Sequence, residues 1–68
     1  MSLGKRIAQA RAAKKLTVAQ LAKLLDVSRS TVHTWEHDGP GPGLDRLTVI
    51  AKTLDTSVSE LLGERVAS

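Results

Sequence analysis

The sequence of 68 residues predicts an all-α fold with five helices in a single domain. Its apolar residues recur at intervals of three and four, which is the period of a helix, and no segment alternates as a strand does. Ser and Thr residues stand where they can cap helices. A chain this short buries only about 60% of its unfolded surface, so it holds one core. We expect the domain to cover residues 1–68, with its core within 3–62 and a short tail at 63–68.

The first helix is expected over residues 3–15, where the inward apolar residues are Leu3, Ile7 and Ala10. Thr17 and Gln20 have the spacing of a capping box, in which a hydroxyl accepts from a backbone N–H and an amide reaches back. They predict the start of a second helix that ends near Leu25.

The third helix is predicted over residues 29–37, with Ser28 as its N-cap. Asp26 lies between the second and third helices and is short and polar, so it can adopt the left-handed conformation of a tight turn. Val32 and Trp35 share one side of the third helix and are expected to face the core.

Alternating Gly and Pro at residues 39–43 predict a loop. A fourth amphipathic helix follows, and its expected inward residues are Leu44, Leu47, Ile50, Ala51 and Leu54. Ser57 and Glu60 predict a second capping box, which opens a short fifth helix through Leu61 and Leu62.

Composition excludes several classes of protein. The chain contains no Cys, so it forms no disulfide or thiolate metal site, and one Trp is its only aromatic residue, which disfavours a stacking platform for single-stranded nucleic acid. No apolar run approaches the length of a membrane helix or a signal peptide, and there is no glycine-rich phosphate loop. We therefore expect a soluble, cytoplasmic protein that binds no membrane, is not an enzyme and uses no cofactor or metal.

The positive charge is concentrated in the first half of the chain. Residues 1–37 carry a net charge of +5 and residues 38–68 a net charge of −2, which together give the overall +3. Such asymmetry favours a basic face for a polyanion, although lysines and arginines also solubilise ordinary helix faces.

The second and third helices, joined by a turn of three residues, have the dimensions of a helix-turn-helix, whose second helix reads bases in the major groove of DNA. The side of the third helix opposite Val32 and Trp35 carries hydrogen-bonding groups for base edges, with Arg29 suited to guanine and the Thr34 methyl to thymine. The expected base-reading residues are Arg29, Ser30, His33 and Thr34. Those expected nearer the phosphates are Thr17, Ser28, Thr31 and His37.

With these elements the sequence resembles the lambda-repressor-like helix-turn-helix family, which includes phage repressors, Cro proteins and the XRE group. The resemblance covers residues 3–62 and is carried by Arg11, Leu16-Thr17, Leu21-Ala22, Val27-Ser28, Trp35-Glu36, residues 42–47, Ile50-Ala51 and Leu61-Leu62. It implies five helices and a transcriptional regulator, in most cases a repressor, that binds double-stranded DNA as a homodimer on a palindromic operator.

The resemblance also implies an ion pair between Arg11 in the first helix and Glu36 at the end of the third. The physical argument for this pair is that Glu36 lies on the flank of its helix and needs a partner if it is partly buried. The alternative is that the two residues are unrelated surface charges.

The sequence departs from the family pattern at three places. Val18 opens the second helix where Gln is frequent, and Asp26 occupies a turn position that usually holds Gly. Residues 38–42 contain no Lys or Arg, so phosphate contacts there are expected from the backbone near Gly43 or from Arg46. Val18 and Gly43 complete the predicted DNA-binding set.

Two other interpretations remain open. The fold can serve to bind protein, as in an antitoxin or adaptor, with Leu24 and Val18 as exposed anchors. Residues 33–37 match the zinc motif H-x-x-E-H, but this interpretation is disfavoured because Trp35 belongs to the core and Glu36 has a competing partner. Candidate dimer contacts are Val58, Leu61 and the tail at 65–68, although core packing is the better explanation for Leu61.

Overall fold

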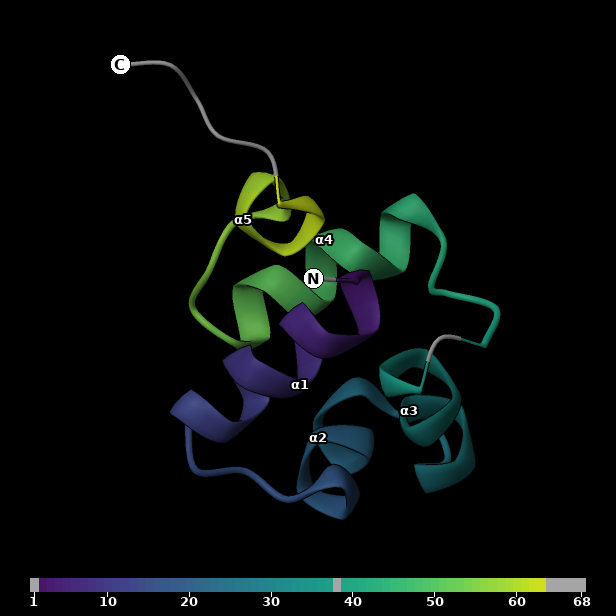
Figure 1. Cartoon of the computed structure of the whole chain (residues 1–68). Helices are drawn as coiled ribbons and strands as arrows, with labels where there is room; N and C mark the ends of the chain where they lie inside the picture. Colours follow the sequence, from purple (N-terminus) through teal and green to yellow (C-terminus); the bar gives the residue numbers. More distant parts are fainter. Residues whose placement is uncertain (1, 38, 64–68) are drawn as a thin grey trace.

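Five α-helices form the part of the chain that this computed structural model describes, residues 2–37 and 39–63 (Figure 1). They are α1 (Leu3–Ala13), α2 (Val18–Leu25), α3 (Arg29–Glu36), α4 (Leu44–Thr53) and α5 (Val58–Leu62). The described residues contain no strand, so the predicted all-α fold with five helices is confirmed. None of these helices combines the length and the hydropathy needed to cross a membrane.

Side-chain oxygens cap the starts of all the helices except α4. Thr17 Oγ1 accepts from the N–H of Gln20 at 3.1 Å, and Gln20 Oε1 accepts from the N–H of Thr17 at 2.8 Å, so the predicted capping box of α2 is complete. Ser28 accepts from the N–H of Thr31 and caps α3, as predicted. These caps fix where both helices begin without any tertiary contact.

The second predicted capping box is only half formed. Ser57 Oγ accepts from the N–H of Glu60 at 3.1 Å, which is the expected N-cap. The Glu60 carboxylate does not reach back to Ser57 and accepts instead from the Thr56 hydroxyl at 3.0 Å. A neighbouring hydroxyl has therefore replaced the backbone amide as the partner of this carboxylate.

Left-handed residues end the first two helices. Asp26 has φ +57° and ψ +46°, which confirms the predicted turn. The first helix stops at Ala13, two residues before the predicted end, because Lys15 also lies in the left-handed region with φ +58°. This reversal lets the N–H of Leu16 bond to the Arg11 carbonyl at 3.2 Å and brings the Leu16 side chain against the core.

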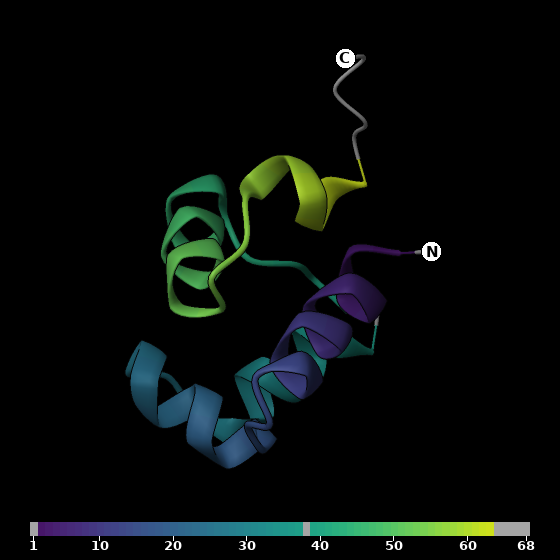
Figure 2. The same cartoon turned by 90° about the vertical axis from the view of Figure 1, so that its left-hand side faces the viewer.

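All five helices contribute to one apolar core. In Figure 2, α1 lies between the α4–α5 pair and the lower part of the fold that α2 and α3 form. The tertiary contacts agree, because α1 packs on α3 and α5 while α2 packs on α3 and α4. The buried core residues are Ile7, Leu21, Ala22, Leu25, Val32, Trp35, Leu47, Ile50, Ala51, Leu54 and Leu61.

The prediction that Leu44 faces the core is wrong, because this side chain is 70% exposed. Leu47, Ile50 and Ala51 define the buried side of α4, and Leu44 lies roughly 70° from its centre at 100° per residue. As the first residue of α4 it also has no preceding helical turn beside it. Leu62, at the end of α5, is exposed as well.

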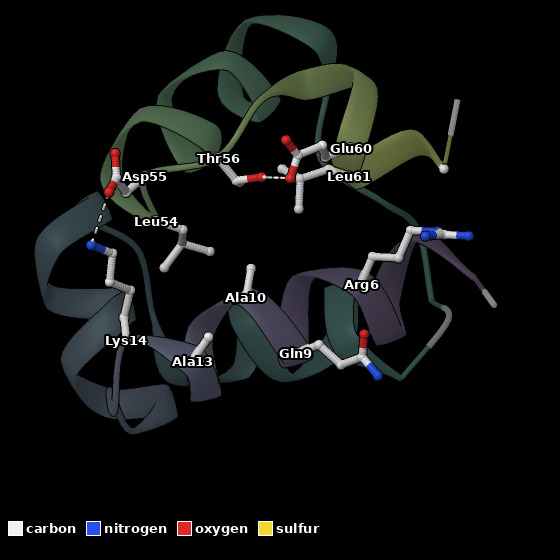
Figure 3. Close-up of a pocket in the computed structure, with 11 residues that line it drawn as sticks. Arg6, Gln9, Ala10, Ala13, Lys14, Leu54, Asp55, Thr56, Glu60 and Leu61 are labelled. Carbon is white, nitrogen blue, oxygen red and sulfur yellow. Dashed lines mark hydrogen bonds and ion pairs between the residues drawn. The ribbon is translucent and has the colours of Figure 1, made fainter. Parts of the chain in front are cut away.

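A cleft of about 680 Å³ separates α1 from α5 and from the turn that precedes it (Figure 3). Lys14 and Asp55 bridge the cleft at one end through an exposed ion pair of 3.3 Å. Leu61 borders the cleft but is buried, so it belongs to the core rather than to a dimer surface. The dimer contacts predicted at 65–68 lie outside the described residues.

The left-handed turn at Asp26 predicts opposite responses to two substitutions. Asp26→Gly is expected to leave the domain at least as stable as the wild type, since glycine adopts this conformation without a Cβ clash. Asp26→Ala is expected to lower the free energy of unfolding by about 1 kcal/mol. Both variants lose the same charge, so the difference between their urea midpoints isolates the backbone effect. An alanine variant as stable as the glycine variant would contradict the prediction.

Candidate nucleic-acid interface

The beginnings of α2 and α3 meet at one end of the molecule, at the bottom of Figure 1. Between them lies a shallow groove of about 620 Å³. Its lining residues are Thr17, Val18, Ala19, Arg29, Ser30, His33 and Thr34. Six of these are predicted site residues, so the fold assembles two separate segments of the predicted set into one surface. Ala19 was not predicted.

Backbone N–H groups give this groove a positive character. The first amides of a helix have no partner within the helix, and the helix dipole places a partial positive charge there. The caps consume the amides of Gln20 and Thr31. The earlier amides of both helices, at residues 18–19 and 29–30, are not among the hydrogen-bond donors of the described residues. Both pairs line the groove, which therefore suits an anion such as a phosphate.

This arrangement explains the contribution of Ala19. Its methyl side chain carries no signal of binding, but its position as the second residue of α2 places its N–H at the helix start. Thr17, by contrast, uses its own N–H and its hydroxyl oxygen in the capping box, so only the hydroxyl hydrogen remains for a phosphate.

Helix α3 has the two sides that its sequence predicts. Val32 and Trp35 are buried, with 0% and 7% of their surfaces exposed. The polar side chains on the other side are all exposed: Arg29, Ser30, His33, Thr34 and His37. The fold thus leaves the predicted base-reading residues free of tertiary packing on their outer side.

Four of the predicted residues lie outside the groove lining. Ser28 and Thr31 share a hydrogen bond between their hydroxyls at 2.8 Å, and Thr31 is half-buried. His37 is the C-cap residue of α3, and exposed Gly43 is the N-cap residue of α4 without a side-chain cap. Arg46, the other candidate near Gly43, donates to the Leu25 carbonyl at 3.1 Å and so ties α4 to the end of α2.

The Thr34 methyl lies close to the loop that follows α3. A Cβ placed on Gly39 would lie 2.5 Å from Thr34 Cγ2, so this methyl lies against the loop that follows α3. The N–H of Gly39 also donates to the Thr34 carbonyl at 3.0 Å. The thymine contact expected for Thr34 stays a prediction, and the structure has this residue in the groove lining with its Cγ2 beside the Gly39 position. Val18 and Ala19 contribute further methyl groups to the lining.

Arg11 on α1 and Glu36 at the end of α3 lie together. Arg11 Nε is 2.7 Å from Glu36 Oε2, and its Nη2 is 3.1 Å from Oε1, so the contact is bidentate. Glu36 is only 8% exposed. A third donor, Nη1, bonds to the Leu16 carbonyl at 2.7 Å. Arg11 thereby links α1, the turn before α2, and the end of α3.

The charge of Arg11 is secure in this setting. Its hydrogen bonds to Glu36 raise the pKa of the guanidinium, burial lowers it, and the negative charge of Glu36 raises it further, so that the net change is upward. Arginine is already protonated at any physiological pH, so the pair remains ionised on the arginine side throughout the accessible range.

Comparison with known proteins identifies the family of this fold. The profile of the helix-turn-helix family HTH_3 matches residues 7–61, from α1 to α5. The chain belongs to this helix-turn-helix family. Membership agrees with the predicted lambda-repressor-like architecture and with the expectation that the chain is not an enzyme.

Several relatives of this helix-turn-helix chain are named as regulators. An uncharacterized HTH-type transcriptional regulator of Bacillus subtilis, YobD, is 38% identical over 85% of this chain and 52% of its own length. The immunity repressor protein of Bacillus phage phi105 is 39% identical over 94% of this chain and 44% of its own length. The HTH-type transcriptional activator BcrR of Enterococcus faecalis is 36% identical over 91% of this chain and 30% of its own length.

The solved structure of a SinR protein/SinI protein complex contains a similar fold. It superposes with a TM-score of 0.82 at 32% identity, covering 91% of this chain and 61% of the other. The three curated relatives named above are longer proteins, and this chain spans about half, or less than half, of the length of each.

The burial of Glu36 predicts a large loss of stability in Glu36→Ala. This change leaves the Arg11 guanidinium without its carboxylate, and breaking a buried pair in this way costs roughly 3 kcal/mol. For a domain of this size, each 1 kcal/mol lowers the melting temperature by about 4–8 °C. Thermal unfolding followed by circular dichroism measures the change.

Lys14→Ala is the matched control, because it breaks an ion pair between two elements that is exposed rather than buried. Its melting temperature is expected to stay near that of the wild type. Equal melting temperatures for Glu36→Ala and Lys14→Ala would show that the Arg11–Glu36 pair is no more than a surface contact.

Proposed function

We propose that this domain is a transcriptional regulator, acting as a repressor, that recognises a specific sequence of double-stranded DNA with α3 in the major groove. The observation that carries the proposal is the groove, where the free amides of two helix starts adjoin the exposed polar side of α3. The names of the relatives support it, since they include transcriptional regulators and a phage immunity repressor.

The groups of the groove divide naturally between bases and phosphates. Arg29 presents a planar fork that matches the O6 and N7 atoms of guanine, while the hydroxyls of Ser30 and Thr34 and the His33 imidazole bond to base edges. The amides at residues 18–19 and the Thr17 hydroxyl hold one phosphate. Ser28, Thr31, His37 and the amide backbone at Gly43 flank the reading residues and contact phosphates of the same site.

We infer that the active species is a homodimer on a palindromic operator. One α3 of eight residues contacts only a few base pairs, and a second copy about 34 Å away along the DNA multiplies specificity. Val58, at the start of α5, is the remaining candidate for a dimer contact among the described residues, although this half-buried side chain also packs against the core. This proposal includes no cofactor, and it places the protein in the cytoplasm with the DNA that it regulates.

Protein binding is the second candidate function, and one observation favours it. Leu24 is 60% exposed on α2, as an anchor for a partner requires. Val18, the other suggested anchor, is half-buried and packs against the core. The similar SinR chain was solved in a complex with SinI protein. A domain that binds no DNA at any salt concentration would favour this function.

Arg29→Ala is expected to weaken binding to the preferred duplex by about 1–3 kcal/mol, or roughly 10- to 100-fold, and to relax the preference at one base pair. Binding by the wild type is expected to fall steeply with rising salt, because cationic groups displace counterions from the phosphates. Fluorescence anisotropy with the preferred and a scrambled duplex measures both effects. The melting temperature should not change, since Arg29 is exposed.

Lys52→Ala is the control, because it removes one exposed positive charge from α4, which packs on α2 and α5. This variant should bind both the preferred and the scrambled duplex slightly more weakly, and to the same extent. Selection of bound duplexes from a random pool supplies the preferred sequence and the half-site spacing. If Arg29→Ala lowered affinity for both duplexes to the same extent as Lys52→Ala, α3 would not be reading bases through Arg29.

A further inference from the structure

His33 and His37 form a pair on the outside of α3. They stand four residues apart, one helical turn, and their rings stack with centroids 4.0 Å apart and planes inclined by 26°. Both side chains are exposed, and no hydrogen bond to either ring is found among the described residues. Both imidazoles are therefore accessible on one side of the helix.

The glutamate between them is directed into the fold. In the motif H-x-x-E-H of a hydrolytic zinc site, the carboxylate and both histidines converge. Here the Glu36 carboxylate is buried and held by two bonds from Arg11. The described residues contain no cluster of three metal-ligating side chains. The structure thus separates the two histidines from the glutamate and does not form a hydrolytic centre.

The two rings are nevertheless close enough for chelation once they turn out of the stack. Imidazole nitrogens bind Zn²⁺ at about 2.0–2.1 Å, so two nitrogens on one ion lie no more than about 4.2 Å apart. The ring centroids lie 4.0 Å apart, and both rings are exposed, so rotation about their side-chain bonds can direct one nitrogen of each toward a common ion. Histidines one turn apart on a helix are a recurrent pair of metal ligands.

We propose that His33 and His37 together bind one divalent ion of the imidazole-preferring class, Cu²⁺, Ni²⁺ or Zn²⁺, on the exposed side of α3. Water completes the coordination, since the described residues offer two ligands here. Neutral nitrogen ligands without a carboxylate select these ions over Mg²⁺ or Ca²⁺. Arg29, one turn before His33, opposes any cation by its charge, which further favours ions with a strong affinity for imidazole.

The ion site overlaps the DNA-reading groove. His33 lines the groove, so an ion on its ring uses a nitrogen that would otherwise bond to a base, and the hydration shell of the ion occupies the space beside it. Ion and preferred duplex therefore compete, and each lowers the affinity of the other by the same factor. This competition rests on the proposed function, whereas ion binding by the free protein does not.

The test begins with the free protein, because these are the only two histidines of the chain and it contains no Cys. Titration with Zn²⁺ is followed through the side-chain ¹⁵N signals of histidine. Both rings are expected to shift along one common binding curve. His33→Gln and His37→Gln are each expected to bind Zn²⁺ at least roughly tenfold more weakly than the wild type. Each variant has lost one of the two ligands of the chelate.

A matched control keeps two histidines but separates them. His37→Gln combined with Lys52→His places one on α3 and one on α4, and it is expected to bind as weakly as the single variants. The proposal is overturned if this double variant or either single variant binds Zn²⁺ as tightly as the wild type. It is also overturned if excess Zn²⁺ shifts neither ring.

The second measurement uses the duplex obtained by selection. Zn²⁺ is expected to lower the affinity of the wild type for this duplex, a chelator should restore it, and His37→Gln should show little response. An unchanged affinity of the Zn²⁺-loaded wild type would overturn the competition. Failure of every duplex to bind would instead refute the proposed function, and the titration of the free protein would still decide the ion site.

Discussion

The bidentate contact between Arg11 and Glu36 is the interaction on which the orientation of α3 depends. Helix α3 has eight residues and buries two apolar side chains, Val32 and Trp35, so apolar packing alone defines its position loosely. A planar guanidinium bound to both oxygens of a carboxylate restricts direction as well as distance. Because Arg11 also bonds to the Leu16 carbonyl, the same side chain sets the turn that leads into α2. One arginine thus couples both helices of the helix-turn-helix to α1.

The helix caps have a structural role that also shapes the surface. Each cap side chain takes the third amide of its helix, and the first two amides remain directed outward. In α2 these are the amides of Val18 and Ala19, next to the capping box of Thr17 and Gln20. The box holds them in a fixed direction before any anion arrives, so binding loses little conformational entropy. This explains how an alanine and a valine contribute to a polar groove.

Sequence predicted well those features that local chemistry controls. Thr17, Ser28 and Asp26 act within three or four residues of themselves, so residue type and spacing were enough to place two helix starts and one turn. The periodicity of α3 likewise separated its buried side from its exposed side. The pairing of Arg11 with Glu36 spans 25 positions and came from the family resemblance, since spacing along the chain carries no such information.

The errors arose where rotamers or tertiary neighbours decide the outcome. Leu44 has a helical spacing compatible with the core, but it lies at the edge of the buried side of α4 and its side chain is left exposed. Glu60 found a nearer hydroxyl on Thr56. Thr34 is on the exposed side of α3, as predicted, but the closeness of its Cγ2 to Gly39 is a rotamer detail that helical spacing does not give. The closeness of Gly39 to Thr34 also constrains substitution near the end of α3. A side chain at position 39 would place its Cβ 2.5 Å from Thr34 Cγ2, so one of the two must shift. Ser30 and His33 are exposed, so substitutions there are expected to cost the fold little. The exposed side of α3 is therefore open to substitution at its centre and constrained where the helix meets the following loop.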